Sequence, residues 1–151
     1  MIRFVYGKDD EVGDFVARLT GMPRGVVAGG KAIGVVKDDE LIGGVVYHHW
    51  SPEAGTIVMS GASASARWLT RPVLKRIFDY PFVECGCQMV VMQVAESDFR
   101  LQRQLAVIGF AFVKIARLYG RGKDGVIATL TAEDWHESRF NRRIVELEEA
   151  A

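Results

Sequence analysis

Four side chains in this 151-residue sequence are candidates for general-base chemistry. Glu96 follows the apolar run at 89–94, while His48, His49 and Glu53 lie in an earlier segment. A carboxylate or imidazole can take a proton from a reacting group within hydrogen-bond reach. We rank Glu96 first, with a solvated loop carboxylate as the alternative. His48 and His49 alternate along an expected strand, so one should face a cleft or the interior and the other the opposite side. A packed or surface histidine is the alternative for each.

The two cysteines, Cys85 and Cys87, are separated by a single glycine. Zinc sites usually have three or four protein ligands, and the three histidines lie far from this pair in the sequence. A disulfide across one residue would close a small and strained ring. We therefore expect two reduced, structural thiols at the end of a helix, and no metal site.

The stretch from Met89 to Val113 defines the elements around the first candidate base. Its opening residues are almost all apolar and lack a helical period, which predicts a strand buried on both faces. Ser97 or Asp98 then offers a side-chain oxygen to cap a helix. That helix carries an apolar stripe at helical spacing: Leu101, Leu105 and Ile108. Gly109 ends the helix, and Phe110 begins the next strand.

The other elements follow from the same periodicities. Further strands are expected at 2–6, 32–37, 41–50, 56–60, 114–119 and 126–131. Further helices are expected at 9–19 and 70–85, and residues 21–30 are expected to form a glycine-rich loop. Two hairpins are expected, around 38–40 and 120–125.

This order of elements resembles the GNAT acetyltransferase family, as does the pair Gly109-Phe110 at the end of a helix. The resemblance spans roughly residues 2–131. It implies an α/β (α+β) fold with a central mixed, mostly antiparallel sheet of six to seven strands flanked by helices. The family has two helices between its first two strands, so the second must here be short or be replaced by the loop at 21–30. We expect a GNAT-like domain over 1–132 and a C-terminal helical extension over 133–151.

Apolar residues recur in the extension at roughly helical spacing: Trp135, Phe140, Ile144 and Leu147. Three arginines lie between them. One interpretation is a helix that packs on the domain. The other is a helix that binds a partner or forms a homodimer.

The resemblance implies acetyl-CoA as the acyl donor and a small-molecule or protein amine as the acceptor. In the family the fourth and fifth strands part, and the pantetheine arm of the cofactor lies between them. The corresponding segments here are 56–60 and 89–94. Backbone groups near Val58 and Ser60 would then bind the pantetheine and polarise the thioester carbonyl. A plain core strand is the alternative.

The family's pyrophosphate loop corresponds to residues 65–70. Trp68 and Thr70 stand where the family has small residues, but the backbone N–H groups on either side of Leu69 remain. Thr70 is suited to cap the following helix, while Arg67 and Arg71 supply positive charge to the phosphates. For the two arginines, simple solvated charge is the alternative.

Catalysis in the family is direct attack of a neutral amine on the thioester, while a base accepts the amine proton. Asp98 falls at the polar opener of a helix that contacts the cofactor, where asparagine is usual. Leu105 stands where the family often has a tyrosine that protonates the leaving thiolate. Tyr119 is the candidate substitute, with a structural tyrosine as the alternative. A thiol leaves readily, since its free pKa is about 8.5.

Composition bounds the partners of the chain. Nineteen basic and nineteen acidic residues cancel, so no overall field attracts nucleic acid or a membrane surface. The first residues do not resemble a signal peptide, and no window reaches the roughly 18 apolar residues of a membrane span. We expect a soluble, cytoplasmic N-acetyltransferase. The alternative is a GNAT-fold module that binds acyl-CoA or a protein partner without turnover, which Trp68, Thr70 and Leu105 favour.

Overall fold

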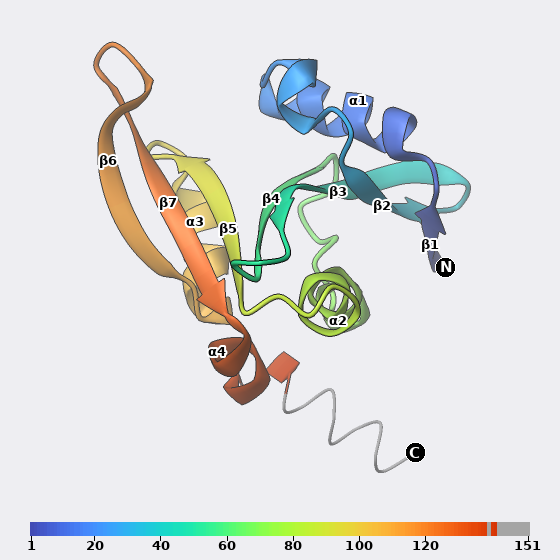
Figure 1. Cartoon of the computed structure of the whole chain (residues 1–151). Coiled ribbons are helices and arrows are strands. Elements are labelled where there is room, and N and C mark those ends of the chain that lie inside the picture. The colour runs from blue at the N-terminus through green and yellow to red at the C-terminus, as the bar shows by residue number, and fades with distance from the viewer. Residues whose placement is uncertain (139, 142–151) are drawn as a thin grey trace.

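One seven-stranded sheet organises the computed structural model, which describes residues 1–138 and 140–141 (Figure 1). The strands lie in the order β1-β2-β3-β4-β5-β7-β6. Their bounds are β1 Ile2–Tyr6, β2 Lys31–Lys37, β3 Glu40–Ser51, β4 Thr56–Ser63, β5 Met89–Ala95, β6 Ala111–Gly120 and β7 Lys123–Thr131. Neighbouring strands are antiparallel except β4 and β5, which are parallel. The expectation of a mixed, mostly antiparallel sheet is therefore confirmed.

Helices cover both faces of this sheet (Figure 1). They are α1 Asp9–Thr20, α2 Arg71–Asp79, α3 Phe99–Ile108 and α4 Ala132–Glu137, with a short 3₁₀ helix, η1, at Arg24–Val27. The side chains of α1 pack on β2 and β3 in a small core centred on Val12, Val16 and Val46. The larger core lies on the other face, between the sheet and α2, α3 and α4. The expected second helix before β2 is thus reduced to η1.

Helix α2 ends earlier than the predicted helix at 70–85. It stops at Asp79 and continues as one π turn, η2, from Tyr80 to Glu84. Pro81 has no N–H to give to the carbonyl of Ile77, four residues earlier. The buried hydroxyl of Tyr47 donates to that carbonyl instead, at 2.5 Å. A tertiary hydrogen bond therefore stabilises the helix end, and burial raises the pKa of Tyr47 well above its usual value.

Helix α3 begins and ends as the sequence predicts. The carboxylate of Asp98 accepts a hydrogen bond from the N–H of Leu101 at 3.2 Å, so Asp98 rather than Ser97 is the cap. Gly109 ends the helix with a φ of +123°, a conformation that side chains with a Cβ rarely adopt. The N–H of Gly109 bonds back to the carbonyl oxygens of Leu105 and Ala106.

Gly109→Ala is expected to lower the free energy of unfolding by about 1–2 kcal/mol, because alanine is strained at positive φ. A Cβ at this position would meet only Leu130, at 3.6 Å, so the backbone carries the cost. The matched control is Gly25→Ala in η1, where a Cβ would have nothing within 4 Å. Urea unfolding of both variants measures the difference in their free energies of unfolding. Equal stability of the two would contradict the assignment of Gly109 as a helix end that needs a positive φ.

The first residues of the expected C-terminal extension pack into the main core. Trp135 in α4 is 1% exposed, and its ring lies 4.8 Å from that of Phe78 in α2. Phe140 packs against the same core. Ile144 and Leu147, the other members of the predicted apolar stripe, lie outside the described residues. Among the helices of the described chain, none is both long and apolar enough to cross a membrane.

Candidate active site

The parallel strands β4 and β5 separate part of the way along their length. They pair only between Thr56–Val58 and Met89–Val91. Beyond those residues no pairing joins Met59–Ser63 of β4 to Met92–Ala95 of β5, and the two strands run apart in Figure 1. We call these two unpaired stretches the split. Strands that part leave backbone N–H and C=O groups without their sheet partners.

The direction of the backbone groups in β4 follows from two hydrogen bonds. The N–H of Ala64 bonds to the carbonyl of Ile42 in β3 at 2.9 Å, whereas the carbonyl of Gly55 accepts from Gln88, just before β5, at 2.7 Å. Because these directions alternate along a strand, even-numbered residues of β4 bond to β3 and odd-numbered residues face β5. Met59 and Gly61 therefore present their N–H groups to the split. The N–H groups of Val58 and Ser60, the predicted positions, face β3.

The loop between β4 and α2 contains Trp68. Its indole lies over the sheet, where a Cβ on Gly43 would meet the ring at 2.5 Å and a Cβ on Gly61 would meet it at 3.9 Å. Glycine at position 43 makes room for the ring, whereas a Cβ at position 61 would be in ordinary contact with it. Leu69 packs against the main core. Thr70 occupies the cap position of α2, but its side chain makes no capping hydrogen bond, contrary to our expectation.

Arginines surround the start of α2. Arg67 and Arg71 come from the loop and the first turn, and Arg100 reaches over from α3 to donate to the carbonyl of Ala66 at 3.2 Å. Within the part of the chain that the structure describes, no carboxylate pairs with these three guanidinium groups. Arg100 was missed from sequence because it is distant from the loop along the chain. Unpaired guanidinium groups beside a helix N-terminus are suited to hold phosphate.

Glu96, the first-ranked base, lies away from the start of the split. It follows the end of β5, five residues past Val91, or roughly 16 Å along the strand. Its carboxylate pairs with Lys114 of β6 at 2.8 Å, and Lys114 also lies 3.6 Å from Asp124. The hydrogen bond from Lys114 to Glu96 raises the pKa of the ammonium group. Glu96 is thus engaged with a cation at the surface.

Tyr119 of β6 lies near the cap of α3. Burial raises the pKa of its phenol, and the charge of Asp98 adds to the effect. The ring also packs over Gly125 of β7, where a Cβ would come within 2.6 Å of it. A phenol, with an ordinary pKa of about 10, is protonated at neutral pH, which is the state of a proton donor.

His48 and His49 lie on the same side of β3, so the prediction that they face opposite sides is wrong. A register shift between His48 and Ser51 marks a β-bulge, and His49 adopts a positive φ of 52° there. The bulge turns the ring of His49 back onto that of His48, with the two Nδ1 atoms 2.6 Å apart. The Nε2 of His48 lies 2.9 Å from the hydroxyl oxygen of Ser60 in β4. The structure thus joins His48, His49 and Ser60 beside the split.

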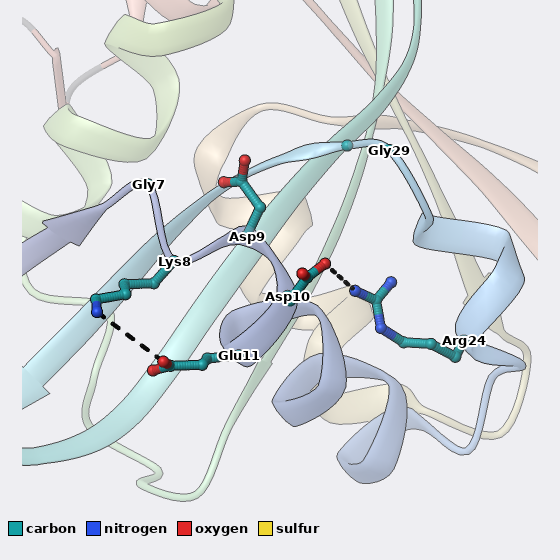
Figure 2. Close-up of a pocket in the computed structure, with 8 residues that line it drawn as sticks. Gly7, Lys8, Asp9, Asp10, Glu11, Arg24 and Gly29 are labelled. Atoms are coloured by element: carbon teal, nitrogen blue, oxygen red, sulfur yellow. Dashed lines mark hydrogen bonds and ion pairs between the residues drawn. The ribbon is translucent and has the colours of Figure 1, made fainter.

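Two surface cavities lie elsewhere, at the β1 side of the sheet. One, of about 450 Å³, is formed where β1 leads into α1, and Figure 2 shows the residues that line it. Its charged groups pair among themselves: Arg24 with Asp10 at 3.4 Å, and Lys8 with Glu11 at 4.0 Å. The other, of about 410 Å³, lies between β1, β2 and α2. Neither cavity is lined by a residue of the split, although the second reaches Tyr47 of β3, which pairs with Met59.

The fold is shared with several solved acetyltransferases. A spermidine/spermine N-acetyltransferase of Vibrio cholerae superposes with a TM-score of 0.73 at 13% identity, over 89% of this chain and 97% of that chain. A dodecameric structure of spermidine N-acetyltransferase from the same organism gives 0.69 at 13% identity, over 90% and 96%. A ribosomal-protein-S5-alanine acetyltransferase of Vibrio fischeri gives 0.60 at 15% identity, over 70% and 63%.

Sequence comparison adds no relative to these structural ones. No sequence family matches the chain, and no curated protein matches it. At such low identity the superpositions establish the fold and not the reaction. The resemblance to the GNAT acetyltransferases is therefore confirmed as a shared GNAT fold, at 13–15% sequence identity to those structures.

Proposed function

We propose that this chain transfers an acetyl group from acetyl-CoA to a primary amine. The observation that carries the proposal is the split, where Met59 and Gly61 present N–H groups toward β5. An extended pantetheine arm can pair with such groups as an added strand, and an N–H can polarise the thioester carbonyl as the amine attacks it. Val58 and Ser60 would contribute through their side chains, on the neighbouring face.

In this proposal, positive charge binds the pyrophosphate of the cofactor. Arg67, Arg71 and Arg100 surround the N-terminus of α2, where free N–H groups also favour an anion. The N-terminus of α3 is less suited, because the carboxylate of Asp98 already occupies it. Asp98 would instead contact the pantetheine arm, with Tyr119 beside it as proton donor to the departing thiolate.

His48 is the base that the geometry favours over Glu96. Burial and the neighbouring His49 lower the pKa of His48 to about 4, so the imidazole is neutral at physiological pH. It is also hydrogen-bonded to Ser60, which lies at the split. Glu96 is paired with Lys114 and lies further along β5.

A module that binds acyl-CoA or a protein partner without turnover is the second candidate function. The observation that favours it is the position of Trp68. Its indole lies against Gly61, one of the residues that face the split. A bulky ring here narrows the space for the pantetheine arm, whereas the family's small residues leave it open.

Titration calorimetry with acetyl-CoA and with free CoA is the first test. The second test is an assay that detects the free thiol of released CoA, run with a panel of amines at neutral pH. The panel includes spermidine and a peptide with an N-terminal alanine, because the superposed enzymes bear those acceptors in their names. Micromolar binding together with amine-dependent CoA release supports the transferase. Binding without release on any amine would favour the module instead.

The double variant Arg67→Ala/Arg71→Ala is expected to weaken acetyl-CoA binding about tenfold or more, because two charge-assisted contacts to phosphate are lost. Calorimetry on wild type and variant measures the change, and the salt dependence of the affinity should fall with it. Arg18→Ala is the matched control, since Arg18 lies in α1 on the opposite face. An unchanged affinity in the double variant would remove the two arginines from the cofactor site.

A further inference from the structure

Three side chains form a continuous hydrogen-bonded chain from the split to the protein surface. It runs from the Ser60 hydroxyl to Nε2 of His48, at 2.9 Å, and from Nδ1 of His48 to Nδ1 of His49, at 2.6 Å. The two rings meet edge to face, with centroids 4.8 Å apart. His48 is 7% exposed, whereas His49 is exposed to solvent. A buried imidazole therefore connects a hydroxyl at the split to an imidazole in contact with water.

The contact between the two Nδ1 atoms requires one shared proton. Two bare nitrogens at 2.6 Å would repel through their lone pairs, and two protonated nitrogens would clash. When His48 holds this proton, its Nε2 is bare and accepts a hydrogen bond from Ser60. When His49 holds it, the Nε2 of His48 is protonated and donates to Ser60. Both arrangements keep every hydrogen bond. The first becomes the second when one proton crosses each contact, Ser60 takes up a proton from outside the chain, and Nε2 of His49 releases one.

The backbone is bent in a way that creates this contact. On a regular strand His49 would point to the opposite face from His48. The bulge at His48/Ser51 and the positive φ of His49 bring the two rings together. A positive φ is strained for a residue other than glycine, and such strain gathers at functional sites. Burial meanwhile keeps His48 singly protonated, since its pKa is lowered to about 4.

We propose that Ser60, His48 and His49 form a proton relay that carries the proton of the acceptor amine from the split to solvent. The relay rests on the proposed acetyl transfer and assigns to that reaction a catalytic hydroxyl, Ser60, and two positioning residues behind it. The sequence identified each of these three residues separately. It did not show that they are joined by hydrogen bonds.

The step balances as follows. The amine nitrogen forms a bond to the thioester carbonyl carbon, and the C–S bond breaks when the tetrahedral intermediate collapses. The amine proton passes to the Ser60 oxygen while the Ser60 proton passes to Nε2 of His48. The proton on Nδ1 of His48 passes to Nδ1 of His49, which releases a proton to water from Nε2. The thiolate of CoA takes up one proton, so the protein ends with no net change in charge.

The wild-type protein, with no substrate, gives the first test. In ¹⁵N-histidine NMR spectra we expect a strongly deshielded imidazole proton shared by His48 and His49, which disappears in His49→Ala. We also expect His48 to stay neutral until the pH approaches 4. Two histidines that titrate independently, each near the ordinary pKa of about 6.5, would overturn the relay whatever the activity of the protein.

Activity gives the second test. Ser60→Ala and His49→Ala should each lower kcat about 10–100-fold, with the loss shrinking at high pH, where hydroxide takes the proton. In His49→Ala the dissociation constant of acetyl-CoA should be unchanged. Ser60→Thr should restore most of the rate because it keeps the hydroxyl. Thr20→Ala, a hydroxyl variant at the end of α1, is the control. Wild-type kcat in both variants, or an acetyl group trapped on Ser60 by mass spectrometry, overturns the relay.

The two proposals fail in different ways. A wild-type protein that neither binds acetyl-CoA nor releases CoA with any amine overturns the proposed function, and the catalytic role of the relay falls with it. Wild-type turnover with unaltered kcat in the Ser60 and His49 variants overturns the relay alone and leaves the transferase intact.

Discussion

His48→Gln is expected to lower the kcat of amine acetylation about 10²-fold or more, the usual effect of removing a general base. Glutamine can keep a hydrogen bond to Ser60 but cannot take up a proton. Glu96→Gln should change kcat by less than about fivefold, because the change breaks only a surface ion pair with Lys114. Steady-state rates of CoA release at saturating acetyl-CoA measure both variants under the same conditions.

Two controls separate chemistry from folding in this comparison. Acetyl-CoA binding by calorimetry should be unchanged in both variants, since neither side chain is placed at the pyrophosphate. Lys114→Ala releases Glu96 from its cation and should leave the rate as it is. If Glu96→Gln loses more activity than His48→Gln, the carboxylate is the base, and the histidine pair has a structural role.

The fold was predictable because its signals are local. Strand ranges follow from alternation and apolar runs, and the α3 boundaries follow from a capping aspartate and a terminal glycine. The end of α2 was not predictable, even though Pro81 marks it. The carbonyl that the proline leaves without a partner is bonded by Tyr47, which lies thirty residues earlier in the chain. A sequence pattern does not show such a distant partner.

Individual residues of the candidate site were predictable from the sequence, but the contacts between them were not. The sequence identified His48 and Ser60 separately, but their contact depends on which strands pair. The two histidines were assigned to opposite faces because alternation holds only on a regular strand, and the bulge at His49 breaks it. The N–H groups of Met59 and Gly61 were missed for a related reason. The direction of a backbone group is fixed by the hydrogen bonds of its neighbours, which appear only when the sheet is assembled.

Glu96 illustrates what the order of residues along the chain leaves out. Its position after a buried strand correctly suggested the parted end of β5. Its partner Lys114 comes from β6, which no local sequence pattern places beside it. The carboxylate is therefore held in an ion pair that its position along the chain does not reveal. The order of residues along the chain thus located the end of β5. The pairing of strands determined which side chains there are held in ion pairs.

Trp135→Ala is expected to lower the free energy of unfolding by about 3–5 kcal/mol, the cost of removing a large aromatic side chain from a packed core. Trp135 is 1% exposed and lies 4.8 Å from the ring of Phe78, while the hydroxyl of Thr131 caps its helix by accepting from the N–H of Asp134 at 3.1 Å. A loss of this size corresponds to a fall in Tm of about 6–20 °C for a chain of this length. Chemical unfolding and calorimetric melting measure the two quantities.

Trp50→Ala is the matched control, because the same side chain is removed from a position that is 53% exposed. Its cost should stay below about 1 kcal/mol. A large difference between the two variants means that α4 belongs to the folding unit formed by the sheet and α2, so that residues 132–137 cannot be removed without loss of the core. Equal stability of the two variants would mean instead that α4 packs on a domain that is complete without it, as the boundary expected after residue 132 implies.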